Sequence, residues 1–260
     1  MNLITELPRA TWLIFRMHLA STAASRRALA GILFAAVPPL FAFLALHFGG
    51  SDNGERVFMN LGVLVLLQVV APALGVFLGI GAIADETEAR TITYPFTRPI
   101  PRASVFLGRW LASLLVLTVL LFASGAGVAA VTMGPEGGTS TEAASALISA
   151  TLVAGAVYSL GAAVIGVIFK RGQVIALGYA FAFEVMLANI PGSAQKLSLQ
   201  YYLRSLFAGG DSADWRSLEV FSRAEFMESS ASAERLLITA AVLLAVGCIT
   251  VTRKQFVLSS

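Results

Sequence analysis

The sequence predicts an all-α membrane protein with six transmembrane helices. Of its 260 residues, 57% are hydrophobic and only 13% are charged, and the mean hydropathy is +0.80. A soluble domain carries about a quarter charged residues. Long apolar runs alternate here with short polar segments, and a helix of about 20 apolar residues crosses a hydrocarbon core of about 30 Å. We therefore expect one membrane-embedded domain over residues 1–260.

The apolar runs place the expected spans. They lie at about residues 29–48, 57–84, 110–133, 143–169, 173–190 and 235–251. Pro38-Pro39 lies in the middle of the first span and predicts a break or a kink there, because proline removes a backbone donor. In the second span, Gly75 and Gly79 form a small-xxx-small pattern, which allows a neighbouring helix to approach closely.

Two further segments are amphipathic rather than membrane-spanning. Residues 1–28 are interrupted by charges, but their apolar side chains recur at helical spacing, so we expect an interfacial helix anchored by Trp12. Residues 191–234 form the longest polar segment. They predict two short amphipathic helices, separated near Gly209, that rest on the extracytoplasmic surface of the membrane.

Basic residues predict the topology. Most of them gather at one set of span ends: Arg9, Arg16, Arg26, Arg27, Arg90, Arg98, Arg102, Arg109, Lys170, Arg171, Arg253 and Lys254. The other short loops hold only Arg56, and acids balance the bases of the long segment before the last span. By the positive-inside rule, both termini and the segment 85–109 face the cytoplasm. No basic stripe with interleaved aromatic residues is present, which excludes a nucleic-acid partner.

The segment Asp85–Arg109 separates two membrane-length apolar runs with charged residues and prolines. It reads DETEARTITYPFTRPIPRASVFLGR. Prolines 99 and 101 predict a rigid turn, because a proline disfavours helix in the residue before it. The residues from Glu86 to Thr97 are expected to form a short helix with apolar side chains available for burial. An ordinary solvated loop would account for the charges of this segment, but not for the motif that it contains.

That motif resembles the conserved cytoplasmic region of ABC-2 type transporter permeases. In that family the second span ends in acidic residues, followed by Gly-Thr-Leu, an apolar stretch, Pro-(Ile/Val)-Ser-Arg and Gly-(Lys/Arg). The matching positions follow here without a gap: Glu86, Glu88, Thr91-Ile92, Pro99-Ile100-Pro101-Arg102 and Gly108-Arg109. The chain departs from the family pattern at Arg90, Pro95 and Pro101.

The resemblance implies the membrane subunit of an ABC exporter. Such a subunit is a multi-pass protein of the plasma membrane, here the bacterial inner membrane. It works as a homodimer or heterodimer surrounded by lipid, and it couples ATP hydrolysis by a separate ATPase subunit to translocation. The residues expected to couple to the ATPase are Glu86, Glu88, Arg90, Thr91, Ile92, Tyr94, Phe96, Arg98, Pro99 and Arg102.

The chain lacks the residues that its own catalysis would need. None of its three lysines lies in a Gly-x4-Gly-Lys-Ser/Thr pattern, so we expect no ATP hydrolysis by a P-loop. It has one cysteine, Cys248, and two histidines far apart in the sequence. We therefore expect no cofactor, no metal site and no catalytic residue.

Glu184 is the only acid well inside an expected span. An intramembrane carboxylate is a functional candidate by default, as a group that lines the substrate path or carries a proton. It is equally compatible with a structural hydrogen bond to a neighbouring helix. The proton-carrying interpretation leaves open a proton-coupled secondary transporter, and a non-transporting membrane anchor is a third alternative.

Overall fold

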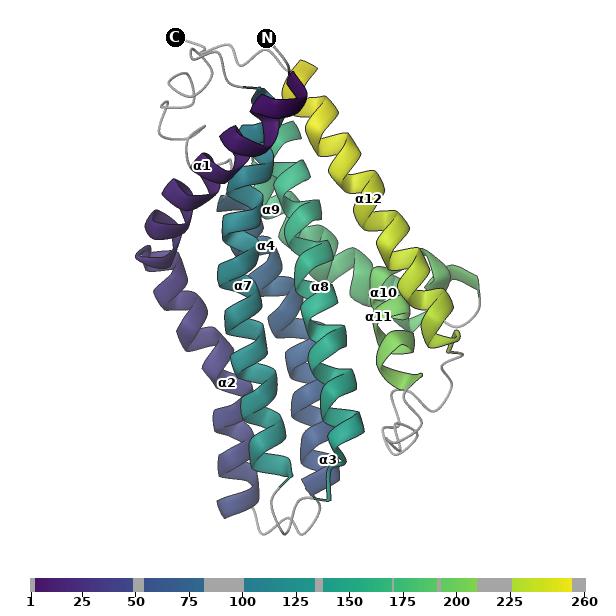
Figure 1. Cartoon of the computed structure of the whole chain (residues 1–260). Helices are drawn as coiled ribbons and strands as arrows, with labels where there is room; N and C mark the ends of the chain where they lie inside the picture. Colours follow the sequence, from purple (N-terminus) through teal and green to yellow (C-terminus); the bar gives the residue numbers. More distant parts are fainter. Residues whose placement is uncertain are drawn as a thin grey trace.

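The computed structural model of the protein describes residues 3–48, 54–81, 101–133, 138–169, 171–190, 193–209 and 226–253. Every element within these ranges is helical (Figure 1). The elements are α1 (Leu3–Ala23), α2 (Arg26–Phe48), α3 (Gly54–Phe58), η1 (Met59–Val70), α4 (Ala71–Gly81), α7 (Arg102–Thr132), α8 (Thr141–Ile168), α9 (Gly172–Leu177), η2 (Gly178–Phe183), α10 (Glu184–Asn189), η3 (Ser193–Leu197), α11 (Leu199–Ala208) and α12 (Ser229–Arg253). The predicted all-α membrane fold is confirmed.

Five helices of the described chain are long and apolar enough to cross a membrane. They are Arg26–Phe48, Gly54–Gly81, Arg102–Thr132, Thr141–Ile168 and Ser229–Arg253. The remaining expected span, at 173–190, corresponds to α9, η2 and α10, in which Gly172–Phe183 is a shorter apolar helix. In Figure 1 these three elements lead from the end of α8 to the level of its middle, where α11 follows.

Three helix ends lie together. The start of α1, the start of α7 and the end of α12 occupy the same end of the bundle (Figure 1). Arg102 opens α7 and Arg253 closes α12. This end of the bundle therefore holds two of the basic residues that the sequence places on one side of the membrane.

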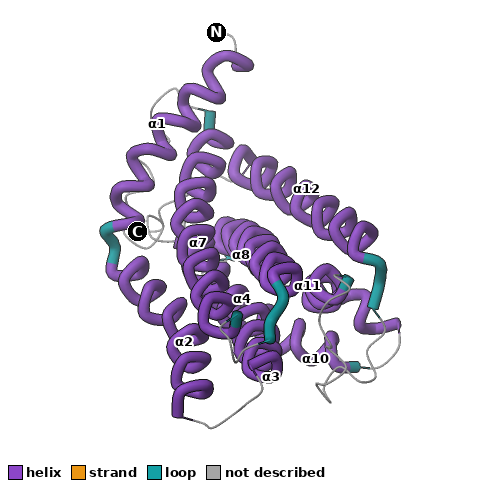
Figure 2. Tube along the Cα trace, turned by 60° about the horizontal axis from the view of Figure 1, so that its bottom comes forward, coloured by secondary structure: helices purple, strands orange, loops and turns teal. Residues whose placement is uncertain are grey.

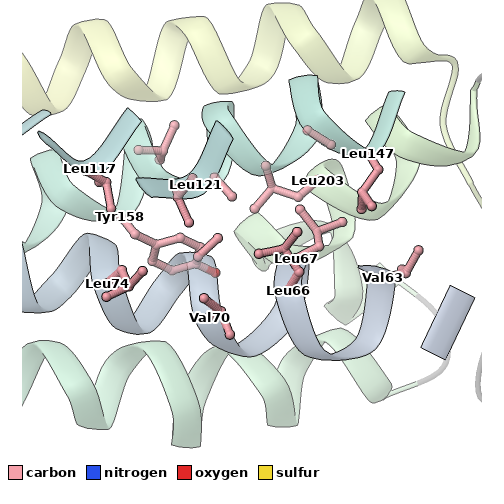
Figure 3. Packing of buried hydrophobic residues seen from close by; sticks show 14 of the residues in the cluster. Val63, Leu66, Leu67, Val70, Leu74, Leu117, Leu121, Leu147, Tyr158 and Leu203 are labelled. Carbon is pink, nitrogen blue, oxygen red and sulfur yellow. The ribbon is translucent and has the colours of Figure 1, made fainter. Parts of the chain in front are cut away.

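Helix α8 forms the centre of the bundle. Figure 2 shows α4, α7, α11 and α12 arranged around it, and all four pack against it. The buried hydrophobic core lies between α8 and these helices. Tyr158 of α8 lies among Leu74, Leu117 and Leu121 of the neighbouring helices (Figure 3). The outward faces of α2 and α12 stay apolar and exposed, as expected for helices that meet lipid.

The small-xxx-small pattern lies at the closest helix contact. A Cβ atom added to Gly79 would lie 2.2 Å from the carbonyl oxygen of Ser159, and one added to Gly75 would lie 3.0 Å from the Cβ of Tyr158. Lipid is as apolar as leucine, so close van der Waals packing is what associates helices in a membrane. The indole of Trp110 adds a hydrogen bond of 3.2 Å from its Nε1 to the Ser159 hydroxyl.

The proline pair does not break α2. The helix runs unbroken from Arg26 to Phe48 through Pro38-Pro39, so of the predicted break or kink the break does not occur. Gly127 of α7 lies against this point, since a Cβ atom there would be 2.9 Å from the Cβ of Pro39. Packing against a neighbouring helix supports a proline that an isolated helix would not tolerate.

The segment before α12 also differs from expectation. It does contain the predicted amphipathic helix, α11, but this helix packs against α8 and α12 instead of resting on the surface alone. Gln200, Arg204 and Ser205 of α11 are all buried. The second expected helix falls largely on residues 210–225, outside the described residues, and α12 begins at Ser229, before the expected start.

Candidate functional site

The predicted coupling segment is described only at its end. Its coupling residues outside the described residues are Glu86, Glu88, Arg90, Thr91, Ile92, Tyr94, Phe96, Arg98 and Pro99. Pro101 precedes α7 with φ −58° and ψ 125°, an extended conformation. Arg102 is the first residue of the helix. The last part of the family-like motif therefore belongs to the rigid start of a 31-residue helix.

Helix α1 packs directly on this part of α7. The Ser104 hydroxyl lies 3.3 Å from the Leu7 carbonyl oxygen, to which it donates. A Cβ atom on Gly108 would lie 2.8 Å from the Thr11 carbonyl oxygen, so only glycine permits this approach. Arg109 is buried, with 8% of its surface exposed. The Gly-Arg pair of the motif thus has a packing role that spacing alone does not reveal.

Replacing Gly108 by leucine is expected to separate α1 from α7. The added side chain would collide with the backbone carbonyl oxygen of Thr11, which cannot move aside as a flexible side chain would, and with the side chain of Ile14. Amide hydrogen exchange across residues 3–23 should become faster in this variant. Gly178→Leu is the control, because nothing lies within 4 Å of the Cβ position there. Unchanged exchange in α1 would contradict the contact.

A second site lies around Glu184, which is fully buried. Its carboxylate accepts three hydrogen bonds: from the Tyr179 hydroxyl at 2.5 Å, from the Ser198 hydroxyl at 2.7 Å and from the Gln200 backbone N–H at 3.2 Å. Ser198 is also the N-cap of α11, where its hydroxyl accepts from the same Gln200 N–H. The carboxylate therefore lies at the positive end of the α11 dipole, a favourable place for a negative charge.

The π-helical element η2 explains why sequence reasoning missed Tyr179. Tyr179 and Glu184 are five residues apart, and residues five apart do not share a face of an α-helix. In a π-helix the backbone hydrogen bond runs from i to i+5, which turns such residues toward each other. Because η2 spans Gly178–Phe183, Tyr179 reaches Glu184 across a π-helical turn. The spacing of an α-helix would not bring these two residues together.

Arg204 connects α11 to a different span. Its Nη2 donates to Oε1 of Gln68 at 2.7 Å. Gln68 lies in η1, the other π-helical element of the described chain. Burial lowers the pKa of the Arg204 guanidinium to about 10, so it stays charged at neutral pH. Helix α11 is thus held by α10 at its first turn and by η1 one and a half turns further on.

The three hydrogen bonds join Glu184 to η2 through Tyr179, to the N-cap of α11 through Ser198 and to α11 itself through Gln200. This geometry is compatible with the structural alternative and with the functional one. Close by, the side-chain amide of Gln200 and the Tyr158 hydroxyl are buried beside each other. They extend the polar region around Glu184 onto α8.

The comparison with protein families decides which kind of transporter this is. The model of the ABC-2 family transporter protein matches residues 14–252. The chain belongs to the ABC-2 transporter family. The match begins within α1 and runs almost to the end of α12. In the comparison with curated proteins, none matches the chain.

Membership makes this chain a multi-pass membrane permease of an ABC transporter, a transport subunit and not a catalytic enzyme. Family members associate with an ABC ATPase subunit. In the described parts of this ABC-2 permease, no group of three His, Cys, Asp or Glu side chains is placed to hold a metal ion.

Proposed function

We propose that this ABC-2 permease is the membrane half of an exporter and that a separate ATPase subunit docks on the segment 85–109 from the cytoplasm. The observation that carries the proposal is the gapless family motif of this segment. Its last residues open α7 at the end of the bundle where α12 closes with Arg253. Both termini would then be cytoplasmic, in the plasma membrane of a bacterium.

The packing of α7 suggests how ATP-driven movement would reach the spans. The helix runs from the proposed docking segment along the whole bundle and contacts α1, α2, α4, α8 and α12. A push at Arg102 would therefore move α1 and α7 together and be passed on to the core around α8. Two permease copies, identical or different, would form the substrate route between them, as the family resemblance implies.

The proposal predicts that a P-loop ATPase co-purifies with this chain. The full-length permease would be extracted from its native membrane in mild detergent, and the bound proteins would be identified by mass spectrometry. Deleting Thr91–Phe96 is expected to remove the ATPase, since the deletion takes out the centre of the motif. Arg102→Glu should weaken binding at least tenfold, because it reverses a charge at the end of the docking segment.

Arg253→Glu is the matched control. Arg253 lies at the same end of the bundle but outside the docking segment, so this variant should keep the ATPase. Retention of the ATPase after both the deletion and Arg102→Glu would remove the docking proposal. A wild-type chain that brings down no P-loop ATPase at all would favour the non-transporting anchor or the proton-coupled alternative.

A further inference from the structure

The described chain contains a half-enclosed cavity that the proposed function does not use. It has a volume of about 490 Å³ and lies between α8, α9, α12 and the η3–α11 segment. Its walls are mainly apolar, formed by residues such as Val157, Ala162, Ile165, Ala176, Ile238 and Leu243. Cavities that bind small ligands in proteins have volumes of about 300–1,000 Å³, so this one is large enough for a ligand.

Two cations line the cavity, Lys196 of η3 and Arg235 of α12. Both side chains are exposed, and neither makes an ion pair with another residue of the described chain. The Tyr202 hydroxyl donates to the Lys196 carbonyl oxygen at 2.7 Å, which fixes the backbone at this edge. Both cations lie on the predicted outer side, where the positive-inside rule gives no reason for a basic residue.

The cavity has a polar end and an apolar end. Along α12 it extends from Arg235 to Leu243, and at 1.5 Å per residue these eight steps cover about 12 Å. Beyond Arg235 the lining residues of α12 are Ile238, Thr239 and Leu243. A ligand that carries negative charge at one end and hydrocarbon at the other would match this lining.

We propose that the cavity holds an acyl chain of a membrane lipid whose anionic headgroup lies between Lys196 and Arg235. The outward faces of α12 and α9 are rich in exposed apolar side chains, among them Leu237, Val242 and Val174, so lipid reaches the cavity from the side. A soluble anion would satisfy the cations but leave the apolar wall empty. The proposal goes beyond the exporter function and does not depend on ATPase docking.

The test measures lipid binding to the delipidated, detergent-purified full chain. The probes are dipalmitoyl phosphatidylglycerol, which is anionic, and dipalmitoyl phosphatidylcholine, which has the same chains and no net charge. Retained lipid would be counted by native mass spectrometry over a concentration series. We expect the anionic lipid to bind at least tenfold more tightly, because each basic residue near an anionic headgroup contributes several-fold in affinity. Glycerol phosphate, a headgroup without chains, should not compete.

Two variants separate the headgroup from the chain. The double variant Lys196→Gln/Arg235→Gln should lose the preference for the anionic lipid and keep the weak binding of the neutral one. Gly161→Leu should weaken both lipids at least tenfold, since Gly161 lines the cavity and its Cβ position is clear up to Leu243 at 3.8 Å. The added leucine side chain would occupy the space of the acyl chain.

Controls use the same substitutions elsewhere. Arg253→Gln neutralises a cation at the other end of α12, and Gly178→Leu adds a leucine where nothing is nearby, so both should bind as the wild type does. All variants would be compared only where their melting temperatures match the wild type. An anionic preference that survives the double variant would overturn the headgroup assignment. Unchanged binding in Gly161→Leu would overturn the chain site, and competition by glycerol phosphate would show a soluble anion instead.

Discussion

Replacing Glu184 by alanine is expected to destabilise the permease and to release the first turn of α11. The variant removes the carboxylate that accepts from the hydroxyls of Tyr179 and Ser198 and from the N–H of Gln200. The Gln200 N–H keeps the Ser198 hydroxyl as an acceptor, and the Ser198 hydroxyl keeps the backbone carbonyl of residue 184, so the Tyr179 hydroxyl loses most. A hydrogen bond to a charged group contributes about 1.5–3 kcal/mol, so we expect a loss of about 2 kcal/mol in total. For a chain of this size that corresponds to a melting temperature lower by about 4–8 °C.

Two measurements would check this result in detergent. Thermal unfolding gives the global loss, and amide hydrogen exchange in residues 199–208 reports whether α11 has become free. Glu184→Gln should lose less, because its carbonyl oxygen still accepts while its NH₂ group faces a donor. Tyr179→Phe removes a single hydrogen bond and should cost about 1 kcal/mol.

Glu142→Ala is the matched control, since Glu142 is an exposed glutamate in the first turn of α8. It should leave the exchange of α11 unchanged. If Glu184→Ala also left α11 protected, the carboxylate would not be its anchor, and the proton-carrying interpretation would gain weight. Transport that stops in Glu184→Gln while α11 stays protected would point the same way.

Replacing Gly79 by leucine is expected to separate α4 from α8. The new Cβ atom would lie 2.2 Å from the carbonyl oxygen of Ser159 and 2.7 Å from its Cα. Both are backbone atoms in the central helix, so no rotamer change relieves the collision. Overpacking a core costs about 1–3 kcal/mol and more where the backbone must move, and we expect at least the upper value here.

The same substitution at Gly178 provides the control for Gly79→Leu. Gly178 has no atom within 4 Å of its Cβ position, and leucine favours a helix over glycine by about 1 kcal/mol. Size-exclusion chromatography after heating should show early loss of the Gly79→Leu variant and wild-type behaviour for Gly178→Leu. The Trp110–Ser159 hydrogen bond should also weaken. Trp110→Phe should therefore lower the stability less in the Gly79→Leu background than in the wild type. A Gly79→Leu protein as stable as the wild type would contradict the close contact.

Both experiments concern the parts of the bundle that hold α8 and α11 in place. Gly75 and Gly79 bring α4 onto α8, and Glu184 and Gln68 attach α11 from two different spans. The family motif follows α4 directly, soon after Gly79, and leads into α7. A movement that starts at the docking segment would therefore reach the α4–α8 contact at Gly79 first, and the hydrogen bonds of α11 only through the long helices.

The positions of the long helices followed from the sequence alone. The described membrane-length helices overlap five of the six expected apolar runs. The ends agree closely for α8, at Thr141–Ile168 against 143–169, whereas α7 starts at Arg102 against 110 and α12 at Ser229 against 235. The reason is that a bilayer demands internal hydrogen bonding and a minimum apolar length, and both are properties of a single segment. The family motif is likewise local, because it occupies one continuous segment, and family membership was predictable from it.

What only the tertiary structure decided depends on contacts between segments. The unbroken α2 depends on Gly127 of α7, which lies against Pro39. The early start of α12 depends on Ser229, whose hydroxyl donates to the Leu206 carbonyl oxygen of α11. The partner of Glu184 depends on a π-helical turn that no spacing rule predicts. In each case a distant residue supplies the hydrogen bond or the packing that offsets a locally unfavourable conformation. A sequence pattern describes one segment at a time, so it could predict the helices of this permease but not the network that joins them.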